Sequence, residues 1–412
     1  MRAIFLLSSW AVLLLFSMIT ATLARADQIS IEFEELDQYA SKTSASAKIL
    51  EKKLQLTLAE RDENLKWSNP EVAYDREDVE QAEEFQITLG KQIEMPWVYF
   101  SRRGSWKSRV KAAELSRTDN IDRLLAELKS GYVRLKLLDE QQNHLDLLRD
   151  IITDASHAAS KRQAEGHISG IDEHLIQMFL ITMMTQYQSV IQEKRLAEIH
   201  WKVQMGIDPG TTLELPTEVD YQVVELPSMS ELTGVIENRP GYLSQLAMQE
   251  WLKRRAKTER RQLFPSFNLY GGFKKVDSEF DGYVVGVALD LPLFNLNGAS
   301  VRRFEIESDI AARETEIYRR ELSGRIEALI SSSEELRQTL SLVADHVDQD
   351  MKIAHAILLS YEEGWMSLGD FLNSIQIEVT GMQDYYDQLI DYYSNLFELE
   401  AITGSKLVSF VQ

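Results

Sequence analysis

The chain has 412 residues, a formal net charge of −21 at pH 7 and no cysteine. The missing thiols exclude disulfides, thiolate catalysis, cysteine-ligated metal and an acylated N-terminal cysteine. The acidic balance argues against nucleic acid as a partner and favours cations, basic partners or simple solubility.

Residues 1–26 have the pattern of a cleaved secretory signal peptide. Arg2 precedes a mostly apolar run, and Ala24-Arg25-Ala26 forms a small-residue cleavage site before Asp27. No later stretch reaches the ~18 apolar residues that a membrane-spanning helix requires. We therefore expect an exported protein without a transmembrane helix, which leaves a soluble protein or a membrane β-barrel.

The rest of the chain reads as two copies of one unit. Five short motifs recur in the same order about 195 to 198 residues apart. The pairs are Asn69-Pro70 with Phe264-Pro265, Leu89-Gly90 with Val285-Gly286, Met95-Pro96 with Leu291-Pro292, Gly166-x-x-Ser169-x-x-Asp172 with Gly364-x-x-Ser367-x-x-Asp370, and Gly206 with Gly404. This near-constant offset predicts a first repeat over 27–206, an inter-repeat linker over 207–227 and a second repeat over 228–412.

Each repeat is expected to begin with a helix, over 34–66 in the first and 228–263 in the second. Ser228 and Glu231 have capping-box spacing at the start of the second helix.

Two strands are expected next in each repeat, within about 69–97 and 264–294. In 85–97 and 283–293, bulky apolar residues alternate with small or polar ones, which indicates a sheet with one apolar face. A soluble sheet over a core gives the same alternation. The aromatic residues Phe85, Trp97 and Tyr283 near the ends of this face, and lengths close to ~10 residues, favour strands that face lipid.

Three details of the strands carry further expectations. The acidic segments 77–84 and 276–282 are expected to form the turns between the strands of each pair. Lys91 and Asp290 interrupt or flank the alternation, and we expect both to face a water-filled interior.

A very long helix is expected after each strand pair, over 105–165 and 300–363, with a return helix over 172–205 and 370–403. At 1.5 Å per residue the outgoing helices are each ~90 Å long. From Leu322 to Leu358 apolar residues follow steps of three and four, which is typical of a coiled-coil seam. The fold class is therefore mainly α, with antiparallel coiled-coil hairpins over 105–206 and 300–404 and four β-strands per chain. Paired tyrosines at 385–386 and 392–393 are expected to pack between helices.

Four membrane strands cannot close a barrel, because the smallest known membrane barrels have about eight strands. Several chains must therefore share one barrel, with their helices continuing below it as a shared cylinder.

With these features in this order, the chain resembles the TolC-like outer-membrane efflux channels over essentially its whole length after the leader. The resemblance rests on the two-fold repeat, on Arg239-Pro240, on the strand that ends Gly286-Val-Ala-Leu-Asp-Leu-Pro-Leu-Phe-Asn, and on Tyr361-x-x-Gly364-x-x-Ser367-x-x-Asp370-x-Leu372. It implies a homotrimer with a twelve-stranded barrel in the outer-membrane lipid of a Gram-negative bacterium. An α-helical tunnel then crosses the periplasm and meets an adaptor protein and an inner-membrane pump.

The implied function is that of the channel in a tripartite efflux system, a passive conduit that exports small molecules or metal ions without catalysis or cofactor. The missing cysteine places the chain outside the lipoprotein members, and its length and short C-terminus resemble the compact heavy-metal-efflux type. The alternative is a soluble periplasmic coiled-coil adaptor or scaffold protein, which has no use for lipid-width strands. The sequence has no nucleophile motif, phosphate-binding loop or metal-ligand cluster.

The two hairpin tips hold the candidate functional residues. Gly166 and Gly364 are expected to end the outgoing helices in the left-handed conformation, with Gly369 loosening the second turn. Ser169 and Ser367 are expected to cap the return helices, and the carboxylate three residues later, of Asp172 or Asp370, is expected to reach back to a free backbone N–H. The resemblance implies that these tips form the tunnel mouth and contact the adaptor.

The resemblance further implies a gate at Asp370, Asn373, Asp172 and Tyr361. Three copies of Asp370 would form a carboxylate ring that favours cations and binds divalent ions. Asn373 stands where the family often has a second acid, and Asp172 is expected near the mouth. Tyr361 corresponds to a gate tyrosine that contacts a basic residue in the family, although Met366 stands where that basic residue is expected.

Overall fold

The computed structural model describes residues 28–79, 82–228, 234–263, 266–277, 280–289, 294 and 296–410. The expected signal peptide, Glu231 of the expected capping box, and Asp290 lie outside the described residues.

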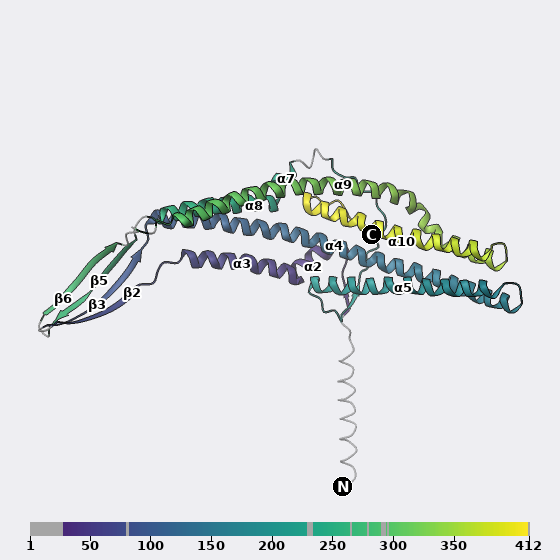
Figure 1. Cartoon of the computed structure of the whole chain (residues 1–412), viewed down its shortest axis with the longest axis horizontal. Coiled ribbons are helices and arrows are strands. Elements are labelled where there is room, and N and C mark those ends of the chain that lie inside the picture. The colour runs from purple at the N-terminus through teal and green to yellow at the C-terminus, as the bar shows by residue number, and fades with distance from the viewer. Residues whose placement is uncertain are drawn as a thin grey trace, which may run out of the picture. The chain divides into compact units, whose positions relative to one another are not determined.

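The described chain is mainly helical (Figure 1). It contains one four-stranded and one two-stranded sheet. In chain order the elements are β1 (Gln28–Ser30), η1 (Phe33–Glu35), α2 (Leu36–Thr43), α3 (Ala45–Leu65), β2 (Glu71–Val79), β3 (Ala82–Ile93), α4 (Pro96–Ala164), α5 (Gly170–Met205), β4 (Thr212–Glu214), α7 (Val235–Asn238), α8 (Pro240–Arg261), β5 (Phe267–Val276), β6 (Phe280–Leu289), α9 (Gly298–Glu362) and α10 (Leu368–Thr403). The long outgoing helices are confirmed, because α4 has 69 residues and α9 has 65. Within the described part of the chain, none of the helices combines the length and the apolar character needed to cross a membrane.

The chain forms two compact units. Unit 1 holds Met1–Lys48, Asp122–Pro227 and Ile326–Gln412, and unit 2 holds Ile49–Ile121 and Ser228–Arg325. Each unit therefore takes segments from both expected repeats. The repeat organisation itself stays a prediction.

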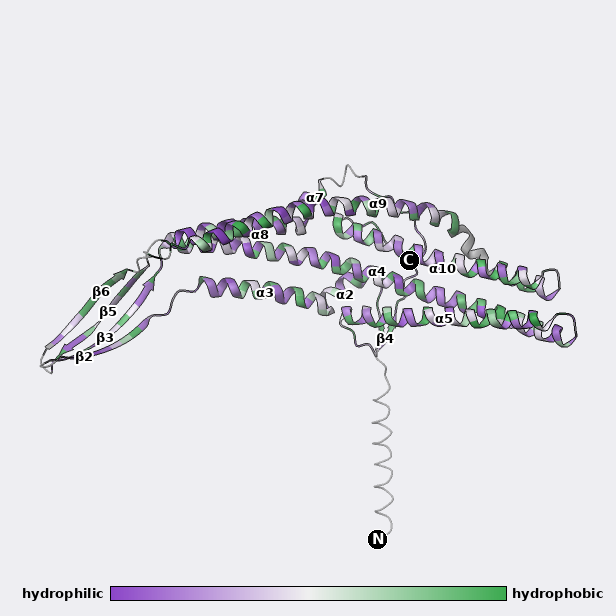
Figure 2. Ribbon diagram, viewed as in Figure 1, coloured by the Kyte–Doolittle hydropathy of each residue, from purple (hydrophilic) through white to green (hydrophobic). Residues whose placement is uncertain are grey.

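The four-stranded sheet of unit 2 is antiparallel, with the strand order β2-β3-β5-β6. Tyr74 pairs with Ile87, Ile87 with Phe273, and Phe273 with Tyr283, so these four side chains form one row on one face. By the same register the apolar face comprises Val72, Tyr74, Ile87, Leu89, Ile93, Phe267, Leu269, Phe273, Tyr283, Val285, Val287 and Leu289. The opposite, polar face carries Glu71, Asp75, Gln86, Thr88, Gln92, Asn268, Tyr270, Lys274, Gly286 and Ala288. Figure 2 shows this alternation of hydrophobic and hydrophilic residues along the strands.

Two expectations about this sheet are wrong. Lys91 pairs with Leu269 and so lies on the apolar face, where its ammonium nitrogen is 5.1 Å from the centre of the Trp67 ring. The contact with an aromatic ring stabilises the charge at this position. Trp97 belongs to α4 instead of a strand, because Pro96 begins the helix, a position that proline favours.

The strands also extend through most of the segments expected to be turns. Glu77 pairs with Glu84 inside the β2–β3 ladder, although both were expected in a turn. Ion pairs join Arg76 to Glu83 and Lys274 to Glu84. These cross-strand pairs let charged residues occupy the strand ends, which the acidic composition alone did not reveal.

Both helices expected to begin the repeats are interrupted. Ser44 separates α2 from α3, and its hydroxyl accepts from the Ala47 N–H at 3.3 Å. Arg239 separates α7 from α8, because the following proline disfavours a helical conformation at this position. In unit 2 the Arg239 side chain is 2% exposed and pairs at 3.0 Å with Asp119, which also accepts from the Gly241 N–H.

In unit 1 the expected linker 207–227 is bound to helices by tyrosine hydroxyls. Tyr132 accepts from the Thr217 N–H at 3.2 Å. Tyr392 accepts from the backbone of residue 224 and donates to that of residue 222, both at 3.2 Å, and Tyr393 donates to the carbonyl of residue 220. Both C-terminal tyrosines are fully buried. They pack between helices as expected, but their role in fixing the linker was missed.

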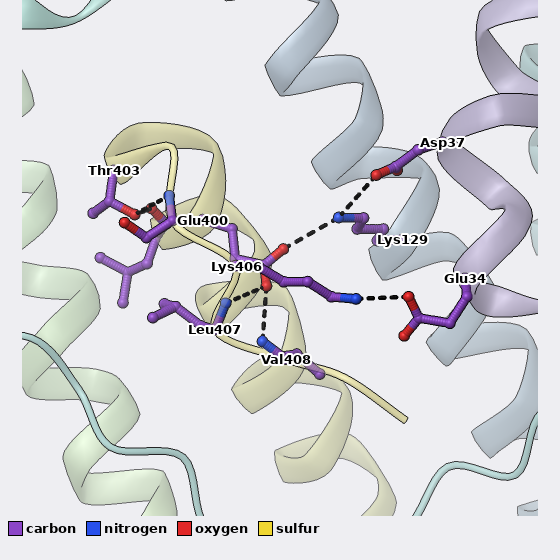
Figure 3. A network of polar contacts seen from close by, with 10 residues as sticks. Glu34, Asp37, Lys129, Glu400, Thr403, Lys406, Leu407 and Val408 are labelled. Carbon is purple, nitrogen blue, oxygen red and sulfur yellow. Dashed lines mark hydrogen bonds and ion pairs between the residues drawn. The ribbon is translucent and has the colours of Figure 1, made fainter. Parts of the chain in front are cut away.

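The segment after α10 is held to unit 1 by Glu400 (Figure 3). Its carboxylate accepts from the backbone N–H groups of Leu407 at 2.6 Å and Val408 at 2.8 Å, and from the Lys129 ammonium at 3.2 Å. Lys406 adds an ion pair with η1 at 2.6 Å. Charge-assisted bonds of this kind are about twice as strong as neutral ones.

A partly buried carboxylate in unit 1 predicts a pH-dependent stability. The pKa of Glu140 on α4 is raised to about 7, chiefly by burial; Lys136 lowers it, and Asp220, Asp139 and Glu218 contribute to the increase. The folded chain therefore binds this proton more readily than the unfolded chain, whose glutamates titrate near 4.5. Stability should rise as the pH falls through 7 toward 4.5.

Replacing Glu140 with glutamine is expected to stabilise the chain at pH 8 and to flatten this pH dependence. Thermal unfolding followed by circular dichroism between pH 8 and pH 5 measures both effects. Glu127→Gln, at an exposed position of the same helix, is the control and should keep the wild-type slope. An unchanged slope in Glu140→Gln contradicts the assignment.

Candidate functional site at the hairpin tips

The two hairpin tips end their outgoing helices in the same way. Gly166 after α4 and Gly364 after α9 both have φ of 78°, in the left-handed region that glycine adopts without strain. At each tip, the N–H of the residue after the glycine donates to the carbonyl five residues earlier, at 2.8 and 2.9 Å. These are the bonds of a Schellman motif, so the expected helix ends are confirmed.

Serine caps both return helices, as expected. Asp172 N–H donates to the Ser169 hydroxyl oxygen at 3.2 Å, and the Asp172 carboxylate accepts from the Ser169 N–H at 3.2 Å. Asp370 N–H donates to the Ser367 hydroxyl oxygen at 3.1 Å, but the Asp370 carboxylate accepts from the Ser367 hydroxyl at 2.7 Å instead of from the expected backbone N–H. Gly369 lies within α10 and is outside the positive-φ glycines, so the expectation that it loosens the turn is wrong.

The predicted gate residues of α10 share an exposed face. Asp370 and Asn373 are both exposed and lie three residues apart, which places them together on the helix surface. Ile377, one turn further along, is 64% exposed. Phe371 and Ile375 lie on the opposite, fully buried side. The exposed face of α10 is therefore polar in its first turn, at Asp370 and Asn373, and apolar one turn later, at Ile377.

Tyr361 contacts a basic residue that the sequence reasoning missed. Arg162, in the last turn of α4, donates from Nη1 to the Tyr361 carbonyl at 3.1 Å, and its guanidinium carbon is 5.6 Å from the centre of the Tyr361 ring. The other side of the tyrosine stacks on Phe371, with ring centres 4.8 Å apart. The basic residue was expected at the position of Met366, but it comes from the other hairpin. The only sequence feature that pointed to Arg162 is its position in the last helical turn before Gly166.

Tyr361 is buried, and charges of both signs act on it. The side chain is 2% exposed, and its hydroxyl oxygen is buried without a hydrogen-bond partner. Burial raises the pKa of Tyr361, Arg162 lowers it and Asp172 raises it. The structure thus brings Asp172 and Tyr361 into one electrostatic environment, with Arg162 between the two hairpins, while Asp370 and Asn373 are exposed.

Replacing Tyr361 with phenylalanine is expected to leave stability unchanged or to raise it slightly. The substitution keeps the ring contacts and removes a buried hydroxyl that has no partner. Tyr361→Ala removes the ring and should cost about 3 kcal/mol. Thermal unfolding of both variants measures the difference, and an equal loss of stability in the two would contradict the role of the ring.

Metal binding at the tips has no support from the geometry. Across the residues that the structure describes, histidine, aspartate and glutamate side chains form no group of three or more that could hold a metal ion.

Solved structures with the same fold include three outer-membrane proteins. The Campylobacter jejuni CmeC outer membrane channel is 15% identical, with a TM-score of 0.75 over 90% of this chain and 85% of that chain. The outer membrane protein VceC from Vibrio cholerae is 14% identical, with a TM-score of 0.74 over 90% and 96%. The open-state Neisseria gonorrhoeae MtrE outer membrane channel is 13% identical, with a TM-score of 0.71 over 90% and 88%. No protein-family model matches the chain, and no curated protein is significantly similar to it in sequence. The chain has the fold of these outer-membrane proteins, and the mainly helical class with a β part is confirmed.

Proposed function

We propose that the chain is the outer-membrane channel of a tripartite efflux system, a passive conduit for small molecules or metal ions across the periplasm and the outer membrane. The observation that carries the proposal is the apolar face of the four-stranded sheet. Tyr283 is 91% exposed on this face and Val285 is 86% exposed. A continuous exposed apolar surface of this kind is typical of a surface that contacts lipid.

The edges of the sheet support a shared barrel. β2 and β6 lie at its two edges, and unpaired strand edges favour pairing with another chain. A homotrimer would join β6 of one copy to β2 of the next and close a twelve-stranded barrel, because four strands are too few to close alone. The apolar face would then meet lipid, and the polar face would line the lumen.

The helices would continue this barrel as a tunnel through the periplasm. At 1.5 Å per residue, α4 is ~100 Å long, which suits a structure that reaches from one membrane toward another. The two repeats, 27–206 and 228–412, would each supply two strands and one hairpin. The chain would reach the outer membrane of a Gram-negative bacterium after removal of residues 1–26. The heavy-metal type of efflux stays a prediction.

The hairpin tips would form the periplasmic mouth. The turns at Gly166, Ser169, Gly364 and Ser367 would meet the adaptor protein, which joins the channel to an inner-membrane pump. The contact of Arg162 with the second hairpin would hold the mouth closed.

The gate should be cation-selective through Asp370. Three exposed copies near the mouth would form a carboxylate ring that attracts cations. Asp370→Asn is expected to lower cation selectivity and to weaken block by divalent ions in planar-bilayer recordings. The matched variant Asn373→Asp adds an acid one turn along the same face and should raise both. Unchanged selectivity in both variants would remove Asp370 from the gate.

The alternative of a soluble periplasmic adaptor or scaffold is not favoured, because it would leave the apolar face in water. Fractionation of cells that express the full chain separates the two functions. The channel should stay in the membrane fraction after a carbonate wash and require detergent for release. Release by carbonate alone would favour the scaffold.

A further inference from the structure

A cavity of about 1010 Å³ lies in unit 2 where the strands meet the helices. The region of α3, the strands and the start of α4 can be followed in Figure 1. This volume is at the upper end of the range for small-molecule pockets. The cavity is separate from the hairpin tips, and the proposed gate does not use it.

One part of the cavity wall continues the apolar face of the sheet, while Gln92 of the polar face also lines the cavity. Ile93 and Leu289 both line the cavity. Each pairs with Phe267, so the three form the last cross-strand row of the apolar face. A molecule that lies along the apolar face can therefore extend into the cavity without crossing a polar row.

Aromatic rings line the cavity beside this row. Trp67 is 70% exposed and Phe100 is 62% exposed. Tyr99 lies between them, with ring centres 6.4 Å from Trp67 and 5.8 Å from Phe100. Exposed tryptophan and tyrosine at the end of a lipid-facing surface are typical of the boundary between hydrocarbon and headgroups.

Two lysines supply positive charge, one in the cavity wall and one next to it. Lys66 lines the cavity and is exposed. Lys91 lies on the apolar face with its ammonium nitrogen 5.1 Å from the Trp67 ring centre. Arg102 also lines the cavity, but both of its terminal nitrogens donate to Glu94, at 2.8 and 2.6 Å. Among the cations that line the cavity, this leaves Lys66 for an anionic ligand, and Lys91 adds a second positive charge beside the cavity at Trp67.

We propose that this cavity binds an anionic phospholipid, with an acyl chain along Ile93 and Leu289 and the phosphate between Lys66 and Lys91. The inference rests on the proposed function, because the apolar face must lie in a membrane. Charge complementarity selects an anionic headgroup, and the continuous apolar row selects an acyl chain over a free anion. A bound lipid would anchor a chain that has no cysteine to acylate.

Native mass spectrometry of the full chain in detergent tests the proposal. The protein is mixed with phosphatidylglycerol or phosphatidylethanolamine carrying identical acyl chains. The wild type should retain the anionic lipid at least about tenfold better than the zwitterionic one, as expected for two lysines near a headgroup. The double variant Lys66→Gln/Lys91→Gln should lose this preference.

The control is Lys52→Gln/Lys53→Gln, which removes two exposed charges from α3 outside the cavity. It should retain the wild-type preference, and circular dichroism should show all three proteins folded. Equal retention of phosphatidylglycerol by the cavity variant and the wild type would overturn the proposal, as would an equal loss in the control.

Two further arms separate the sources of failure. Inorganic phosphate that binds with the same lysine dependence, without retention of phosphatidylglycerol, would assign the cavity to a free anion and overturn the lipid. Carbonate extraction of the wild type tests the membrane location independently. A chain that stays in the membrane but shows no lipid preference overturns this inference alone, whereas carbonate release overturns the proposed function.

Discussion

Replacing Arg162 with alanine is expected to open the tunnel mouth. The substitution removes the hydrogen bond to the Tyr361 carbonyl and the contact of the guanidinium with its ring. Together these contacts are worth about 2 kcal/mol per chain, because both involve a charged group at a partly buried site. A loss of this size raises the population of separated tips more than tenfold in each chain. Single-channel recording in planar bilayers should show a larger conductance or a higher open fraction.

Two further variants give this experiment its controls. Arg162→Lys keeps the charge but loses the planar guanidinium and should have an intermediate conductance. Lys161→Ala removes the neighbouring exposed cation from the same helical turn and should behave like the wild type. A closed channel in Arg162→Ala, or an equal opening in Lys161→Ala, would show that this contact does not hold the tips together.

A single arginine on the apolar face is expected to prevent membrane assembly. Val285 is 86% exposed and pairs with Gly271 near the middle of β6. An arginine on the lipid face of a barrel costs about 2–4 kcal/mol near the bilayer midplane, and a trimer would bear this cost three times. Val285→Arg should therefore deplete the chain from the carbonate-resistant membrane fraction.

The adjacent residue provides a matched control for this prediction. Val284 pairs with Gly272 on the polar face of the same strand. Val284→Arg introduces the same charge one residue away, toward the proposed lumen, and should leave membrane assembly nearly intact. Equal amounts of both variants in the membrane fraction would contradict a lipid-facing role for the apolar face.

The periodic parts of the fold were predictable, because side-chain alternation and helical spacing are local properties of the sequence. The long helices α4 and α9 and the apolar faces of β3 and β6 follow from these patterns. The ends were harder to predict. Pro96 begins a helix that takes Trp97 out of the strand, and the ladder continues through Glu77 and Glu84, where Lys274 pairs with Glu84 across the strands. Both outcomes depend on neighbours that a single segment does not reveal.

At the hairpin tips too, the local features were predictable and the tertiary contacts were not. The caps at Ser169 and Ser367 depend on residues three apart, so their spacing was sufficient to predict them. The contact between Arg162 and Tyr361 joins residues 199 positions apart, and the linker contacts of Tyr392 and Tyr393 span similar distances. The prediction for Lys91 is wrong because it rests on the charge of the side chain, whereas the alternation along β3 places this position on the apolar face. Its contact with Trp67 depends on tertiary structure.

Copies of this chain are expected to form a conducting pore through a membrane. Planar-bilayer recording with the purified full chain measures this conduction. Discrete, cation-selective current steps should appear when the protein is added and should grow in Arg162→Ala. Protein that associates stably with the bilayer, yet gives no current above the lipid-only baseline in either the wild type or this variant, would rule out a conducting pore.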